Sequence, residues 1–487
     1  MPPGFNPVNE RATSVARNPS TRVEPASLLR ELGVSHAGAI VVGTIIGSGI
    51  FLVPAEMMQA VGSARLVYLA WIVGGLLSFF GALTYAELGA MKPQAGGEYV
   101  YIRDAYGPLT GFLYAWTWFL IAKPASIATI TSGMVRVLSS FPALHFLDAA
   151  FIHWTFASGR VFSVTYGSLV AIAATLFISW LNYVGVKKAG EFQLFFTILK
   201  VAMIAGIAVL GFMAASGRWH NFSTHYEGAM GGIAGFMAAL VAALWAYDGW
   251  NDLNMVGGEI RDPERSIPRA LILGVAIVGI LYMGLNAAVQ YVMPAAAVAA
   301  AKVPASAAMQ MAVGGWGATL VSVGMALSML VTLNGTVMSG ARIPYAVSRD
   351  GYFFKALAEV HPRFRTPSLA LLVQAVGAII LLLVGGAFKE LFSLAIFAEW
   401  LFYMIAASTI FVFRRREPDA VRPYRMLGYP VLPALFILSA AFLLYYTFTQ
   451  NLRDSTIGLM VILAGVPVFF MFARRNPNPP TLKRKNG

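Results

Sequence analysis

A glycine-rich segment interrupts the first long apolar stretch of the chain. Residues 43–51 read GTIIGSGIF, and each glycine costs a helix about 1 kcal/mol relative to alanine. Glycines at this spacing also occur where two membrane helices pack closely, so close packing is one interpretation. The other is a helix that unwinds at Gly47, Ser48 and Gly49, which would free backbone N–H groups to bind a carboxylate and carbonyls to bind an ammonium.

A second apolar stretch is interrupted in the middle of the chain. Residues 244–253 read LWAYDGWNDL, which places Asp248 and Asp252 among apolar neighbours. A charge in the middle of a membrane costs several kcal/mol unless it faces protein or water. Two interrupted helices in corresponding halves of a chain are the best sequence indication of a small-molecule site at the centre of a membrane.

Two lysines also lie inside apolar stretches. Lys200 falls within residues 192–209, where a long side chain could extend toward the membrane surface. Its depth favours instead a buried ammonium that has carbonyl or hydroxyl partners and is able to exchange protons. Lys123 is followed by Pro124, and for this lysine we expect a structural ion pair.

The composition indicates which elements must position these residues. Of the 487 residues, 58% are apolar and only 12% are charged, whereas soluble domains carry about 25% charged residues. These fractions exclude a disordered chain and an ordinary cytosolic enzyme. Because about 20 apolar residues span a membrane, the sequence predicts an all-α integral membrane protein with about twelve transmembrane helices. The predicted spans are 38–60, 66–90, 108–138, 162–183, 192–215, 230–256, 270–293, 316–346, 368–387, 391–413, 430–448 and 455–473.

The net charge of +13 has an explanation that needs no nucleic acid. Basic residues concentrate in the cytoplasmic loops of membrane proteins. If both termini are cytoplasmic, most of the 35 lysine and arginine residues fall in cytoplasmic segments, among them Arg414, Arg415 and Arg416. We therefore predict a multi-pass protein of the plasma membrane, in contact with the lipid bilayer, with both termini in the cytoplasm.

Several kinds of chemistry have no support in the sequence. The chain has no cysteine, which excludes disulfides, thiolate metal sites and a cysteine nucleophile. It contains neither a His-Glu-x-x-His metal motif nor a phosphate-binding loop, and its six histidines lie in or beside predicted loops. We expect no metal, no cofactor and no enzymatic activity. A channel is disfavoured because paired broken helices indicate an enclosed site rather than a continuous polar path.

Four motifs together resemble those of the amino acid–polyamine–organocation superfamily, and within it those of bacterial L-type amino acid transporters. They are residues 43–51, YAELG at 85–89 with GGEY at 96–99, residues 245–251, and NG at 334–335 followed by SRDG at 348–351. The resemblance extends from about residue 35 to about residue 475. It implies five helices followed by five of inverted topology and two further helices, with helices 1 and 6 broken. It also implies an α-amino acid substrate that is moved by alternating access.

The same resemblance predicts a division of the chain. A cytoplasmic tail, 1–36, would precede a transporter domain, 37–475, and a second tail, 476–487, would follow it. The transporter domain would contain a first repeat, 37–216, a second repeat, 228–413, and helices 11 and 12 within 430–473.

By position, the first broken helix is expected to bind the substrate backbone. Ser48 and Gly49 match positions whose N–H groups hold the substrate carboxylate in the family, and Gly47 lies beside them. Ile45 matches the position whose carbonyl faces the substrate ammonium.

The sixth helix supplies the other half of this expected site. Trp245 and Asp248 match positions that also face the ammonium, and Trp245 matches an aromatic residue that gates the site. Some relatives have glycine in place of Asp248. The aspartate would therefore either add negative charge near the ammonium or cap the second half-helix.

The resemblance assigns coupling and selectivity to four further residues. Lys200 matches a lysine that stands where sodium-coupled relatives bind sodium, between the first and eighth helices, and a fixed cation there argues against sodium coupling. Ser328 and Thr332, four residues apart on one helix face, match its hydroxyl partners. Relatives often have a neutral amide at Glu399, so this acid would favour cationic substrates, carry a proton, or pair with Lys123 or a hydroxyl.

The resemblance predicts a secondary transporter of L-amino acids that works by sodium-independent exchange or facilitated uptake. Proton-coupled transport, or transport of cationic amino acids or polyamines, is the alternative. A channel or a membrane-embedded enzyme is the least supported reading. Eukaryotic light-chain members of this superfamily are linked to a heavy chain by a disulfide. A chain without cysteine cannot form that link. We expect a monomer or a non-covalent dimer.

Overall fold

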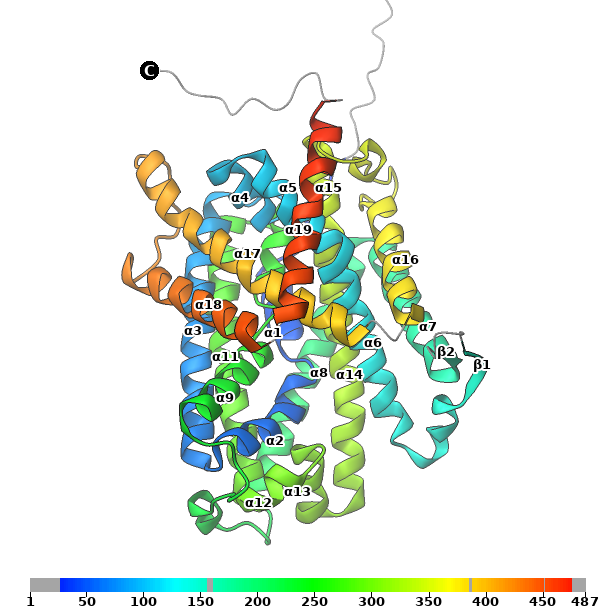
Figure 1. Ribbon diagram of the computed structural model, residues 1–487, viewed down its shortest axis with the longest axis vertical. Helices are drawn as coiled ribbons and strands as arrows, with labels where there is room; N and C mark the ends of the chain where they lie inside the picture. Colours follow the sequence, from blue (N-terminus) through cyan, green and yellow to red (C-terminus); the bar gives the residue numbers. More distant parts are fainter. Residues whose placement is uncertain (1–26, 156–160, 385–387, 451, 475–487) are drawn as a thin grey trace, which may run out of the picture.

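The computed structural model describes residues 27–155, 161–384, 388–450 and 452–474. Most of the predicted N-terminal tail and the whole of the predicted C-terminal tail lie outside the described residues. Figure 1 shows long helices that run side by side, with α12 and α13 at the opposite end of the molecule from the last turns of α19. The boundaries of the two repeats stay a prediction.

All twelve predicted spans are helical: ten helices or helix pairs are long and apolar enough to cross a membrane, and two shorter apolar helices complete the set. In chain order the spans are α1–α2 (Val34–Ile45, Gly49–Val61), α3 (Ala64–Met91), α5–η1–α6 (Pro108–Thr117, Trp118–Ala122, Lys123–Ser139), α7 (Tyr166–Val184), α8 (Val186–Phe212), α9–α10 (Gly232–Ala246, Asp252–Met255), α11 (Pro263–Val292), α14–α15 (Gly315–Gly340, Arg342–Arg349), α16 (Ser368–Val384), α17 (Phe388–Arg416), α18 (Val431–Gln450) and α19 (Leu452–Ala473).

The remaining elements connect these spans. They are α4 (Glu98–Tyr106), η2 (Pro142–Asp148), the antiparallel hairpin of β1 (Ala150–Thr155) and β2 (Val161–Thr165), η3 (Trp219–Ser223), η4 (Gly257–Glu259), α12 (Ala295–Ala300), α13 (Pro304–Val313) and η5 (Lys355–Ala358).

Several predicted helix boundaries differ from those in the structure, most of all at the starts of the fifth and seventh helices. The fourth helix begins at Tyr166, not at 162, because the residues before it pair in the β-hairpin and Thr165 caps the helix. The fifth begins at Val186 rather than at 192 and ends at Phe212 rather than at 215. The seventh begins at Pro263 rather than at 270, since proline is well suited to the first position of a helix.

The first span lies at the centre of the bundle. Of its most apolar window 78% is buried, against 22% for α18 and 28% for α19. α1 packs against α8, α11 and α14, and α2 packs against α9. The two helix breaks are therefore enclosed by protein, while the last two helices leave most of their apolar surface for lipid.

Candidate functional site

The two helix breaks face each other. α1 ends at Ile45 and α2 begins at Gly49, while α9 ends at Ala246 and α10 begins at Asp252. A Cβ on Gly49 would lie 3.1 Å from the Cα of Ala246, and a Cβ on Gly249 would lie 3.1 Å from the carbonyl carbon of Thr44. Glycine at both places lets the two backbones approach closely, and Gly249 also adopts a φ of +107° that other residues rarely adopt.

Hydrogen bonds join the two breaks. The hydroxyl of Thr44 lies 2.8 Å from the carbonyl oxygen of Gly249. The buried hydroxyl of Tyr282, on α11, lies 3.1 Å from the carbonyl oxygen of Ile45 and 2.8 Å from that of Ala246. Sequence reasoning missed Tyr282, because a tyrosine within an apolar helix gives no local indication that it reaches two broken backbones.

The unwound segments leave backbone groups available. The first N–H groups of a helix have no partner within it, and Ser48, at the N-cap of α2, makes no side-chain capping bond. The N–H groups at Ser48 and Gly49 can therefore bind an anion at the positive end of α2. The carbonyl of Ile45 already accepts bonds from Tyr282 and from the N–H of Gly47, so its predicted contact with an ammonium stays a prediction.

Lys200 ties the first break to α14. Its side chain is fully buried, and the ammonium donates to the carbonyl oxygens of Gly43 at 2.9 Å, Ile46 at 2.6 Å and Ser328 at 3.2 Å. Three carbonyl dipoles thus stabilise a charge that has left water. Snorkelling to the membrane surface is excluded by this burial.

The two predicted hydroxyl partners lie beside Lys200 but do not accept its protons. The hydroxyl of Ser328 donates to the carbonyl of Ile46 at 2.7 Å, and that of Thr332 lies 3.1 Å from the carbonyls of both Gly43 and Ile46. The lysine and the two hydroxyls therefore share acceptors on the unwound segment, an arrangement that spacing along one helix cannot specify.

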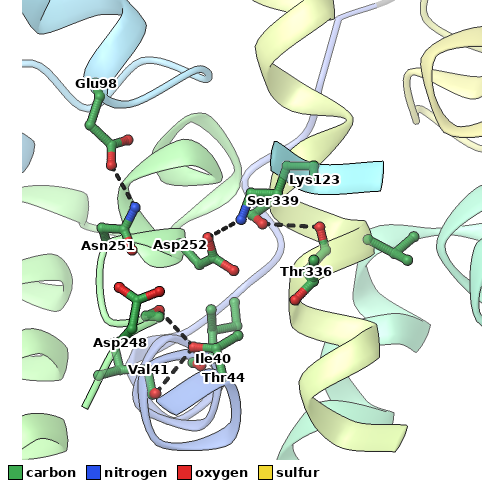
Figure 2. A network of polar contacts seen from close by, with 12 residues as sticks. Ile40, Val41, Thr44, Glu98, Lys123, Asp248, Asn251, Asp252, Thr336 and Ser339 are labelled. Carbon is green, nitrogen blue, oxygen red and sulfur yellow. Dashed lines mark hydrogen bonds and ion pairs between the residues drawn. The ribbon is translucent and has the colours of Figure 1, made fainter. Parts of the chain in front are cut away.

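A cluster of charged residues surrounds the second break. Lys123 forms an ion pair with Asp252, as Figure 2 shows, and no bond between Lys123 and Glu399 is present among the described residues. Asp248 accepts a hydrogen bond of 3.0 Å from Tyr403. It is not the cap of α10, because the N-cap position belongs to Asn251.

A cavity of about 840 Å³ lies between the breaks. The predicted site residues on its wall are Ile45, Gly47, Ser48, Gly49, Trp245, Asp248, Thr332 and Glu399, whereas Lys200 and Ser328 are not part of the wall. Trp245 is 36% exposed, so its indole is only partly covered by the residues around it.

The cavity extends toward one end of the molecule. Its wall includes Arg136 and Ser140, at the end of α6, and Lys302, between α12 and α13. α12 and α13 lie at the end of the molecule opposite to the last turns of α19 (Figure 1). We refer to this end of the cavity, marked by Arg136, Ser140 and Lys302, as the mouth.

The other end is closed by charged and backbone contacts. Arg342 donates to both carboxylate oxygens of Glu259, at 2.7 and 3.0 Å, and neither side chain is exposed. Leu32 pairs with the segment around Ile260 in a short parallel bridge. The N–H of Gly96 bonds to the carbonyl of Met255 at 2.9 Å.

Broken helices that meet across a central cavity with one open end are the architecture of a secondary transporter. Residues 32–472 match the amino acid permease family, and the chain belongs to this family. It is 34% identical to the serine/threonine exchanger SteT of Bacillus subtilis (strain 168), over 93% of this chain and 99% of that protein.

Mammalian proteins are similar over comparable lengths. Identity is 31% with the b(0,+)-type amino acid transporter 1 of Mus musculus, over 93% of this chain and 90% of that protein. It is also 31% with the cystine/glutamate transporter of Homo sapiens, over 96% of this chain and 89% of that protein. The chain is therefore a multi-pass membrane protein that transports amino acids as a secondary transporter, and it is not an enzyme.

Proposed function

We propose that this chain exchanges L-amino acids across the plasma membrane by alternating access and without sodium. The observation that carries the proposal is the meeting of the two helix breaks at the base of the cavity. The free N–H groups at Ser48 and Gly49 would hold the substrate carboxylate, with Gly47 beside them, and Asp248 would attract the substrate ammonium. Trp245 would close over the occupied site.

Lys200 supports the absence of sodium coupling. Its ammonium lies among the carbonyls of Gly43, Ile46 and Ser328, and a sodium ion would need those same oxygens. The lysine would link the shape of the first break to the position of α14 during transport. Ser328 and Thr332 would support the same carbonyls.

We further propose an orientation and an assembly. The mouth would face outward, with both termini in the cytoplasm, since this places most basic residues inside. A monomer or a non-covalent dimer agrees with a chain without cysteine, which cannot form a disulfide-linked heavy-chain pair.

One observation favours a second candidate, transport of cationic amino acids or coupling to a proton. Lys123 neutralises Asp252, which leaves the carboxyl groups of Asp248 and Glu399 on the same cavity wall. Two such groups in one enclosed space attract a cation, either the side chain of a basic substrate or a proton.

Transport in proteoliposomes tests the proposal. Purified protein is reconstituted with unlabelled amino acids inside, and uptake of labelled amino acids is measured with and without a sodium gradient. We expect uptake that depends on internal amino acid and not on sodium. Folded protein that moves no amino acid under either condition would contradict the proposal.

A pair of alanine substitutions locates the site. Gly49→Ala places a methyl 3.1 Å from the backbone of Ala246 and should reduce exchange at least tenfold. Gly284→Ala, on α11, meets nothing within 4 Å and should leave exchange unchanged. Equal exchange rates of the two variants would show that transport does not require the close approach of the two helix breaks.

A further inference from the structure

Glu98 is a buried carboxyl group with one unpartnered oxygen. It begins α4, which lies between the membrane spans Ala64–Met91 and Pro108–Ser139, and its side chain is 0% exposed. Oε1 accepts a hydrogen bond of 2.7 Å from the side-chain amide of Asn251. Oε2 has no hydrogen-bond partner within the described part of the chain.

The surroundings of Glu98 offer no opposite charge in contact with it. Tyr85, Tyr101 and Tyr114 are fully buried nearby. The hydroxyls of Tyr85 and Tyr101 have no hydrogen-bond partner among the described residues, and the hydroxyl of Tyr114 faces the carboxyl group of Glu98 and interacts with it. Burial without a counter-ion favours the protonated form of a carboxyl group. Burial raises the pKa of Glu98 to about 7, although the hydrogen bond from Asn251 opposes this.

The other charged groups around α4 are already paired. Lys123 from α6 and Asp252 from α10 act on Glu98 in opposite directions, and they form an ion pair with each other. Elsewhere on α4, Arg103 pairs with Asp104 and with Asp350 at the end of α15, and Arg416 of α17 donates to the carbonyl of Ala105. Asp248 and Glu399 lie on the cavity wall with Tyr403 and Asn251.

Glu98 lies where the closed end of the cavity is held together. The preceding Gly96 bonds to Met255 on α10. Gly97 adopts a φ of +48°, and a Cβ there would lie 2.8 Å from the backbone of Asn254. The segment 96–98 is therefore pressed against α10. Figure 2 shows Glu98 and Asn251 joined directly above the second break.

The same contacts lead to the cavity. The side-chain oxygen of Asn251 lies 3.3 Å from the hydroxyl of Tyr403, and this hydroxyl lies 3.0 Å from Asp248. The single proton of Tyr403 can serve either acceptor. Hydrogen bonds through Asn251 and Tyr403 thus connect the protonation state of Glu98 to Asp248, a carboxyl group on the cavity wall.

We propose that Glu98 is a proton-binding site whose proton keeps the segment 96–98 against α10 and so keeps this end of the cavity closed. The inference rests on the proposed function, because it concerns the opening of the same cavity. The proton occupies the unpartnered Oε2 in the closed form. On opening it passes to water, and the resulting carboxylate is stabilised by hydration that the closed site cannot supply.

An introduced thiol measures the opening. The chain has no cysteine, and Ala95 packs against Gly258 in the contact that must separate. The maleimide reaction rate is measured for Ala95→Cys and for the double variant Ala95→Cys/Glu98→Gln. We expect the ratio of the first rate to the second to rise several-fold between pH 6 and pH 8. The division removes the pH dependence of the thiol itself. The ionised fraction of a group with a pKa near 7 rises about tenfold over this interval.

The control is a second carboxyl group near the same end. Glu417 is 43% exposed and lies 3.8 Å from Lys92, so Glu417→Gln should leave the pH dependence of labelling unchanged. A ratio that stays constant between pH 6 and pH 8 would overturn the proposal. The proposal would also be overturned if Glu417→Gln reduced the pH dependence of labelling as much as Glu98→Gln does.

Exchange measurements separate the two proposals. Exchange by the unmodified protein should change several-fold between pH 6 and pH 8, because the balance between the closed and open forms shifts, while Glu98→Gln should retain exchange at pH 6 and change less than twofold. Absence of exchange at every pH would refute the proposed function. Exchange with the same pH profile in both proteins would refute the role of Glu98 alone.

A third measurement needs no variant at position 98. Because the pKa of Glu98 is higher in the folded protein than in the unfolded chain, its contribution to stability is complete at low pH and is lost as the pH rises through about 7. The thermal unfolding midpoint of the unmodified protein should therefore decrease from pH 6 to pH 8. A constant or rising midpoint would contradict the inference even if Glu98→Gln failed to fold.

Discussion

The replacement of Lys200 tests how strongly the first break is tied to α14. The ammonium donates to three carbonyls, at 2.9, 2.6 and 3.2 Å, and hydrogen bonds to charged groups contribute about 1.5–3 kcal/mol each. Burying the charge costs several kcal/mol in return. Ser328 and Thr332 still donate to two of the carbonyls when the lysine is removed. We therefore expect Lys200→Ala to destabilise the conformation in which the first break is bonded to α14 by a net free energy of about 2–3 kcal/mol.

A change of this size has a measurable effect on transport. About 2–3 kcal/mol corresponds to roughly a 30- to 150-fold shift between two conformations. Lys200→Ala should therefore lower the initial rate of exchange at least about 30-fold. Lys200→Met, which keeps most of the volume but not the charge, should show the same loss with a smaller decrease in thermal stability.

The assay compares rates from both sides of the membrane. Labelled amino acid is added first outside and then inside reconstituted vesicles, and unfolding midpoints are measured on the same preparations. Lys188→Ala, on an exposed part of the same helix, is the control and should behave as the unmodified protein. Unchanged exchange from both sides in Lys200→Ala would refute the reasoning and leave Lys200 a purely structural role.

Three further variants test the cavity and its closed end. Glu399→Gln should reduce transport of arginine relative to leucine and alanine about tenfold by removing from the cavity wall an acid that can pair with a cationic side chain; an unaltered ranking would exclude Glu399 from selectivity. Arg342→Ala leaves the carboxylate of Glu259 buried without its partner and should lower the free energy of unfolding by about 3–5 kcal/mol; a loss below about 1 kcal/mol, measured by denaturant titration, would contradict this. Gly249→Ala should abolish exchange and destabilise the protein more than Gly107→Ala, since both glycines have positive φ but only Gly249 faces a neighbouring backbone; equal effects would mean that the close approach is unimportant.

The helices could be predicted because their cause is local. A run of apolar residues long enough to cross a membrane forms a helix whatever its neighbours are, since every backbone polar group must be satisfied within the segment. The two breaks were predictable for the same reason: the glycines at 47 and 49, and the charges of Asp248 and Asp252, are poorly suited to a continuous apolar helix. The β-hairpin of β1 and β2 was missed, because most of its second strand, Val161–Thr165, was counted as the start of an apolar helix.

The partners of the site residues could be predicted only in part. Lys123 was expected to have a structural partner, but the structure selects Asp252 and leaves Glu399 on the cavity wall. Ser328 and Thr332 were expected to contact the ammonium of Lys200, and they bond its carbonyl acceptors instead. Each choice depends on how two helices are rotated against each other, which helix periodicity does not determine.

The amino-acid sequence alone determined that Lys200, Asp248 and Glu399 needed an explanation, because apolar spans tolerate few charges and each must meet protein or water. Only the tertiary structure decided which groups meet them. It placed Tyr282 across both helix breaks and Glu98 in hydrogen-bond contact with Asn251, contacts between segments far apart in the chain. The cost of burying a polar group is set by its residue type. The hydrogen bonds that offset this cost require a donor and an acceptor about 3 Å apart, and such pairs form only once the helices have packed.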